Sequence, residues 1–89
     1  MLGFRDDDYI RTIKEIRGAA NNFREEERPS WKRVEPWNVC FLSDNRGYHK
    51  WCIHFFDADG HWHGVSFETP PDADNRWYRE EIARQIRDN

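Results

Sequence analysis

The sequence WCIHFFDADGHWHGVSFET, residues 51–69, decides the fold of this chain. Apolar residues occupy alternate positions toward both of its ends, which is typical of β-strands with one buried face. Between the two ends stands Asp57-Ala58-Asp59-Gly60, a combination of residues that favours a tight turn. The stretch therefore predicts a β-hairpin whose strands cover residues 50–57 and 61–68.

The turn also predicts the register of this hairpin. A three-residue loop at 58–60, ending on a glycine in the left-handed conformation, pairs Asp57 with His61. Counting back from that pair places Ile53 opposite Val65, on the same side of the sheet. Both strands then turn their large apolar residues toward one face, as a core requires.

A third strand is expected before the hairpin, over residues 37–42 (WNVCFL), where apolar residues again alternate. A three-residue loop, Asn45-Arg46-Gly47, joins it to the next strand and is expected to pair Asp44 with Tyr48. The three strands then form an antiparallel meander.

This register divides the sheet into two faces of different composition. The core face is expected to carry Trp37, Val39, Phe41, Trp51, Ile53, Phe55, Val65 and Phe67. The outer face is expected to carry Asn38, Cys40, Leu42, Cys52, His54, Phe56, Trp62, Gly64 and Ser66. The outer set is too apolar for a face left in water, and a contiguous apolar patch on a monomer usually marks a contact site. The alternative is that the N-terminal segment, or the connector that contains Trp31, folds over this face.

Two amphipathic helices are expected to flank the sheet, over residues 7–26 and 75–87, the second capped by Asp72 or Asp74. The apolar stripes are Ile10, Ile13, Ile16, Ala20 and Phe23 in the first helix, and Trp77 or Tyr78, Ile82, Ala83 and Ile86 in the second. Gly18 and Asn21-Asn22 weaken the middle of the first helix. The order α-β-β-β-α predicts an α+β fold in a single domain, residues 1–89. Its simplest form is a three-stranded antiparallel meander with both helices packed on one face.

The charge balance argues against a general nucleic-acid binder, which usually has a basic face. The chain holds 17 acidic and 14 basic residues, for a formal net charge of −3. No apolar run approaches the roughly 20 residues of a membrane span, and the N-terminus lacks the apolar region of a signal peptide. We therefore expect a cytoplasmic protein with no membrane partner, whose two cysteines are free thiols.

The outer face gathers residue types that bind metals, namely Cys40, Cys52 and His54. Their spacing is not that of a zinc finger, and His61 and His63 fall on the opposite face in the predicted register. A cross-strand disulfide between the two cysteines is the other alternative. The interpretation we favour is two free thiols and a surface histidine, with no metal and no cofactor.

Acidic and imidazole groups also meet at the hairpin turn, where Asp57, Asp59, His61 and His63 are close in sequence. Such a group can serve as a general base or a nuclease-like site. Ordinary turn chemistry is the interpretation we favour for the aspartates, since their side chains bond nearby backbone N–H groups. Because no nucleophile, phosphate-binding loop or HExxH motif accompanies the cluster, we expect a protein that is not an enzyme.

The hairpin resembles the arm-type DNA-binding domain of phage integrases, through W51-x-I53-x-F55-x-D57-x-x-G60, S66-F67-x-T69 and Trp77. That resemblance implies DNA binding by the free face of a three-stranded sheet. Those domains carry Lys and Arg on this face, where this chain has Cys52, His54, Phe56 and Trp62. The element order is also similar to that of the double-stranded-RNA-binding domain, although Pro70-Pro71-Asp72-Ala73-Asp74 stands where that family has its basic motif. In type, as a small acidic helix–meander–helix chain, it resembles phage anti-CRISPR proteins and related inhibitors of host defence.

We expect a non-enzymatic binding module that acts by protein–protein interaction, with a phage-type inhibitor of a host nucleoprotein defence complex as the specific form. Its partner is then a protein, which includes nucleic-acid-binding complexes, and homodimerisation through the same face is a further hypothesis. The expected contact residues are Tyr48, His54, Phe56, Asp57, Asp59 and Trp62. The alternative is a DNA-binding module that uses the free face of the sheet, with phosphate contacts from Lys32, Arg33, Arg46 and Lys50.

Overall fold

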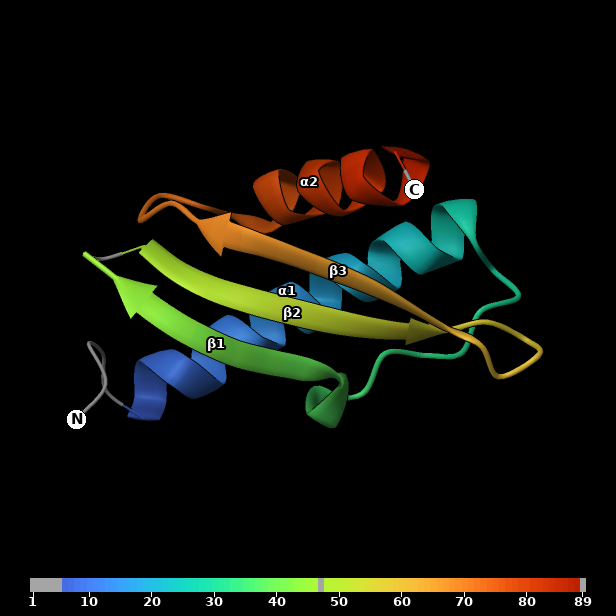
Figure 1. The fold of residues 1–89 in the computed structure, drawn as a ribbon, viewed down its shortest axis with the longest axis horizontal. Helices are drawn as coiled ribbons and strands as arrows, with labels where there is room; N and C mark the ends of the chain where they lie inside the picture. Colours follow the sequence, from blue (N-terminus) through green and yellow to red (C-terminus); the bar gives the residue numbers. More distant parts are fainter. Residues whose placement is uncertain (1–5, 47, 89) are drawn as a thin grey trace.

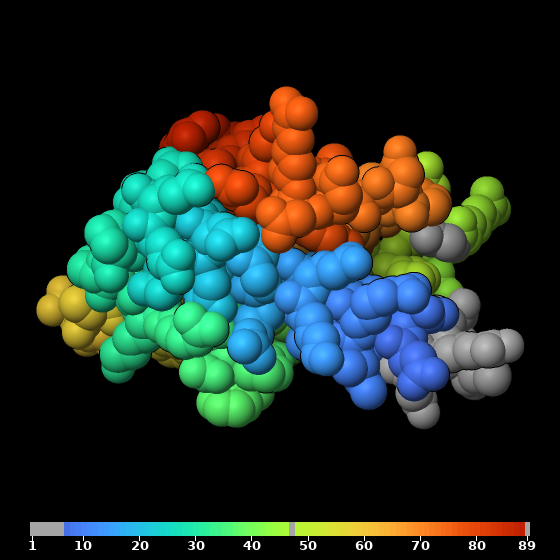
Figure 2. Space-filling model, turned by 180° about the vertical axis from the view of Figure 1, so that it is seen from behind, coloured from blue at the N-terminus to red at the C-terminus, as the bar shows by residue number. Residues whose placement is uncertain are grey.

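The computed structural model describes residues 6–46 and 48–88 of the chain, and it confirms the predicted order α-β-β-β-α. The elements are helix α1 (Asp6–Glu27), the short 3-10 helix η1 (Pro36–Asn38), strands β1 (Val39–Asn45), β2 (Tyr48–Phe56) and β3 (Trp62–Thr69), and helix α2 (Asn75–Asp88). The strands form one antiparallel sheet in the order β1-β2-β3. In Figure 1 α1 passes behind this sheet and α2 lies along the β3 side of it, and the two helices run side by side across the back of the molecule in Figure 2. Within the described residues, neither helix carries an apolar stretch long enough to cross a bilayer.

The second hairpin has the predicted register. Ile53 pairs with Val65, and the Asp57 N–H donates to the His61 carbonyl at 2.9 Å. Gly60 has a φ of 87°, the left-handed conformation that the loop requires and that glycine adopts without steric penalty.

The first hairpin corrects a prediction. Tyr48 pairs with Asn45, so the expected pairing with Asp44 is wrong, and the turn has two residues rather than three. Arg46 has a φ of 54°, as tight two-residue hairpin turns require, while Gly47 lies outside the described residues. A bulge at Leu42 absorbs the extra residue, so the two cysteines still pair as predicted.

Trp37 lies outside the sheet, against the prediction that it faces the core. It sits in η1, and its side chain is 75% exposed. The reason is local: the Asn38 side-chain oxygen accepts the Glu35 N–H at 2.9 Å, and the Asn38 N–H donates to the Glu35 carbonyl. These bonds close a turn at Pro36, so the first strand begins at Val39.

The core lies between the sheet and the two helices. Its buried apolar residues are Ile16, Ala19, Ala20, Phe23, Val34, Val39, Trp51, Ile53, Phe55, Val65, Phe67, Tyr78, Ile82, Ala83 and Ile86. Phe41 is partly buried against this set, as is Tyr9, whose ring packs against Trp51 at 5.4 Å between centroids. Ile10 is 53% exposed, so the predicted α1 stripe holds except that Tyr9 takes the place of Ile10. In α2 the prediction of one buried face is confirmed, and Asp74 caps the helix by accepting the Trp77 N–H.

Asn21 joins α1 to the connector, a role that its weak helix propensity does not reveal. Its side chain is buried, donates to the Val34 carbonyl at 3.0 Å and accepts the Val34 N–H at 2.8 Å. Arg24 donates to the Trp31 carbonyl at 3.0 Å, one turn further along α1. These bonds fix the connector beside the helix, which continues through Gly18 without interruption.

The connector does not cover the outer face of the sheet. Trp31 packs against Phe55 and stacks on His63, whose side chains lie on the core side. Lys32 donates its N–H to the Phe56 carbonyl at 2.7 Å, which ties the connector to the end of β2. The N-terminal segment that could also cover this face, residues 1–5, lies outside the described residues.

Replacing Asn21 by alanine should lower the free energy of unfolding by about 1–3 kcal/mol, because both buried Val34 backbone groups lose their partner. Urea denaturation of Asn21→Ala measures the loss. The matched control is Asn22→Ala, an exposed neighbour on the same helix. Equal stabilities of the two variants would show that the bonds to the connector contribute nothing.

Candidate functional site

The face of the sheet turned away from the helices is uncovered within the described residues (Figure 1). The apolar and aromatic side chains of this outer face, with His54, are those of Cys40, Leu42, Tyr48, Cys52, His54, Phe56 and Trp62, and the strand alternation places Lys50, Ser66 and Glu68 on the same face. Trp62 is 63% exposed, Leu42 52% and Tyr48 44%, while the two cysteines, His54 and Phe56 are partly buried by their neighbours. Two exposed aromatic side chains, Trp62 and Tyr48, with the partly buried rings of His54 and Phe56 on the same face, form a surface that is characteristic of contact sites.

Trp62 is exposed but held in place. A Cβ atom added to Gly64 would lie 2.6 Å from Trp62 Cζ3 and 3.4 and 3.6 Å from the neighbouring Cε3 and Cη2, so the edge of the six-membered ring meets the Gly64 backbone. His54 meets the same ring edge-on at 5.3 Å between centroids. These contacts favour one arrangement of the exposed ring. A side chain that is already ordered lowers the entropic cost of binding.

Cys52 and His54 are neighbours on the outer face, with Cys52 Sγ 3.4 Å from His54 Nε2. Cys40 lies opposite Cys52, and both thiols are free. Burial raises the pKa of the Cys52 thiol, and the nearby Cys40 raises it further, which favours the protonated form. Within the described residues, the ligand atoms of Cys40, Cys52 and His54 do not all come within 4.8 Å of one another, as the ligands of a metal site would.

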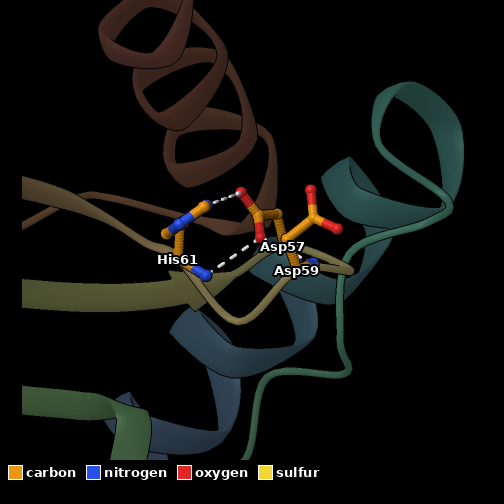
Figure 3. A group of neighbouring side chains, drawn as sticks. All are labelled: Asp57, Asp59 and His61. Carbon is orange, nitrogen blue, oxygen red and sulfur yellow. Dashed lines mark hydrogen bonds and ion pairs between the residues drawn. The ribbon is translucent and has the colours of Figure 1, made fainter.

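The group that does converge is Asp57, Asp59 and His61 at the turn between β2 and β3 (Figure 3). Asp57 Oδ1 accepts the N–H groups of Asp59 and His61 at 2.9 and 3.0 Å. Asp57 Oδ2 lies 3.0 Å from His63 Nε2 and 3.8 Å from His61 Nδ1. The carboxylate thus organises the turn, as the ordinary turn interpretation predicts, and Asp59 lies on its far side from His61 in Figure 3.

The Asp57 carboxylate has a lowered pKa. The main cause is its hydrogen bond to His63, with smaller contributions from the His61 and Asp59 N–H groups and the nearby His61 ring, while partial desolvation opposes them. His63 is itself held by Trp31, on which it stacks with ring centroids 4.5 Å apart and planes 11° apart. The turn is therefore anchored to the connector through one histidine, a link that nothing in the linear sequence indicates.

A hollow of about 500 Å³ lies beside this turn. Its lining residues are Arg28, Trp31, Trp62, His63, Gly64 and Ile86. Of these only Trp62 was among the contact residues predicted from the sequence. Arg28 and Trp31 follow the end of α1, and folding alone brings them to the start of β3.

The basic residues of the DNA-binding alternative do not gather on the outer face. Lys50 is the only Lys or Arg on the described strands. Lys32 and Arg33 lie in the connector beside the end of β2, whereas Arg46 lies in the turn before its start. The length of β2 therefore separates the two sets, and a phosphate backbone would meet few cations between them.

No family model, no curated protein and no solved structure matches this chain. The resemblances to integrase arm-type domains and to anti-CRISPR proteins accordingly stay predictions. The site is described by its own geometry: an aromatic outer face, an ordered turn at its end, and a hollow at the edge of β3.

NMR titration should give Asp57 a pKa below the ordinary value of about 3.9. His63→Phe retains a ring for stacking on Trp31 but removes the hydrogen bond, so it should raise the Asp57 pKa. Because the folded-state pKa is the lower one, the bond stabilises the fold above the ordinary pKa, and this stability is lost as the pH falls through the lowered value. The same Asp57 pKa in both proteins would refute the assignment of the shift to His63.

Proposed function

We propose that this chain is a non-enzymatic binding module that captures a protein partner with the outer face of its sheet. The observation that carries the proposal is the position of Trp62, an exposed indole fixed against Gly64 and His54 on a face that neither helix covers. Large, rigid aromatic side chains dominate the energetics of protein interfaces. Tyr48 and Phe56 extend the same surface along β2.

Acidic residues at the end of this surface favour a partner with a basic surface. Asp59 is exposed at the turn, next to the Asp57 carboxylate, which is charged at neutral pH. Complementary charges of this kind raise association rates and fix orientation more than they raise affinity. The basic groove of a nucleoprotein complex is such a surface, so the more specific proposal is an inhibitor of a host nucleoprotein defence complex, acting in the cytoplasm.

The test is a pair of alanine variants on the outer face. Phe56→Ala with Trp62→Ala should reduce partner capture from an extract of the source cells by about 30-fold or more, since interface hot spots contribute roughly 2 kcal/mol or more. Mass spectrometry quantifies the captured protein, and urea denaturation verifies that the variant is folded. The matched control is Ile10→Ala, which removes an exposed apolar side chain from α1.

Unchanged capture by the folded double variant would refute the assignment to the outer face. Light scattering of the free chain tests the homodimer alternative at the same time. A dimer that the double variant converts to a monomer would show that the partner is a second copy. Specific DNA binding that weakens steeply with salt would favour the DNA-binding alternative.

A further inference from the structure

The free edge of β3 is closed at one position by a side chain from α2. Gln85 accepts the Ser66 N–H through Oε1 at 3.3 Å and donates from Nε2 to the Ser66 carbonyl. A side-chain amide here takes both bonds that a neighbouring strand would make at Ser66. The backbone of Ser66 therefore points away from β2, toward the outside of the sheet.

Gly64 presents its backbone in the same direction two residues earlier. Alternate residues of an edge strand point their N–H and C=O groups to the same side. The Asp57 N–H donates to the carbonyl of His61, the residue just before β3, at 2.9 Å. The backbone groups of odd-numbered residues therefore point toward β2, and those of even-numbered residues such as Gly64 and Ser66 point outward. Gln85 bonds Ser66, and no described residue outside the sheet is bonded to the Gly64 backbone.

The Gly64 backbone faces the hollow that Arg28, Trp31 and Ile86 line from the helix side. His63 stacks on the Trp31 ring, and the Arg28 guanidinium lies over the same ring at 5.7 Å from its centroid. The Trp62 ring meets the Gly64 backbone through its edge.

Arg28 supplies a positive charge that no described carboxylate neutralises. Its guanidinium donates to the Glu27 carbonyl at 2.8 Å and is held over Trp31. The arginines of α2 differ, since each pairs with a carboxylate: Arg76 with Glu80, Arg79 with Glu26, Arg84 with Glu81 and Arg87 with Glu27. The hollow thus combines an open strand edge, an apolar wall and one unneutralised cation.

We propose that an extended segment of the partner protein adds to the free edge of β3 at Gly64 and places an acidic side chain against Arg28. Main-chain bonds to an exposed strand edge are a recurrent way of binding peptides, with neighbouring side chains providing specificity. Arginine favours a carboxylate because its planar fork can donate two parallel bonds. Gln85 ends the open edge at Ser66. This inference deepens the proposed function and rests on its claim that the partner is a protein.

The experiment is an NMR titration of the ¹⁵N-labelled chain with the peptide acetyl-TVEVT-amide. We expect the Gly64 amide resonance to shift and its hydrogen exchange to slow, with a dissociation constant on the order of 1 mM. The same peptide with Lys in place of Glu should bind at least tenfold more weakly. Arg28→Gln should abolish that preference for Glu, while the matched control Arg17→Gln, elsewhere on α1, should retain it.

The inference is overturned if Gly64 does not respond at about 5 mM peptide, or if Arg28→Gln leaves the preference for Glu unchanged. A peptide methylated at its central backbone nitrogen should lose binding, since that nitrogen can no longer donate to the strand edge. The Phe56→Ala variant separates the two proposals, because Phe56 does not line the hollow. If Phe56→Ala loses partner capture while Gly64 of the unmodified chain does not respond to the peptide, the strand addition alone is refuted. If the peptide binds at Gly64 while Phe56→Ala captures the partner normally, the outer face alone is refuted.

Discussion

The structure depends on the alternation of side chains along β2, the central strand. Trp51, Ile53 and Phe55 are fully buried under the two helices. Burying a side chain of this size stabilises the fold by roughly 1.5–3 kcal/mol, and a slip of one residue would move all three into water. The same alternation turns Cys52, His54 and Phe56 to the opposite face, where no described element forms a third layer. A small core and an uncovered aromatic face are thus two consequences of one constraint.

The details around this sheet place the candidate site at one end of it. Gln85 closes the edge of β3 at Ser66, and the connector, fixed by Asn21 and Arg24, brings Trp31 to the start of the same strand. His63 links that connector to the turn through its stacking on Trp31 and its bond to Asp57. The exposed Trp62 is consequently surrounded by ordered groups, as an interface anchor should be.

Sequence patterns predicted the second hairpin because its determinants are local. A glycine at position 60 and two alternating strands are sufficient to set its register. In the first hairpin the predicted loop was wrong but the predicted pairing of Cys40 with Cys52 was right. The turn is one residue shorter than predicted, and the bulge at Leu42 adds one residue to β1, so the two differences cancel. Trp37 was misplaced because a turn at Pro36, closed by Asn38, decides where the strand begins. The hollow involves Arg28, which reaches β3 only through tertiary contacts, so no sequence pattern could have indicated it.

Photo-crosslinking tests the central claim, contact through the outer face, most directly. Benzoylphenylalanine placed at position 62 retains an aromatic group there, and the same residue at position 10 reports on an exposed site of α1. After irradiation in an extract of the source cells, we expect a discrete protein adduct from position 62 and none from position 10. An adduct from position 10 with none from position 62 would contradict it.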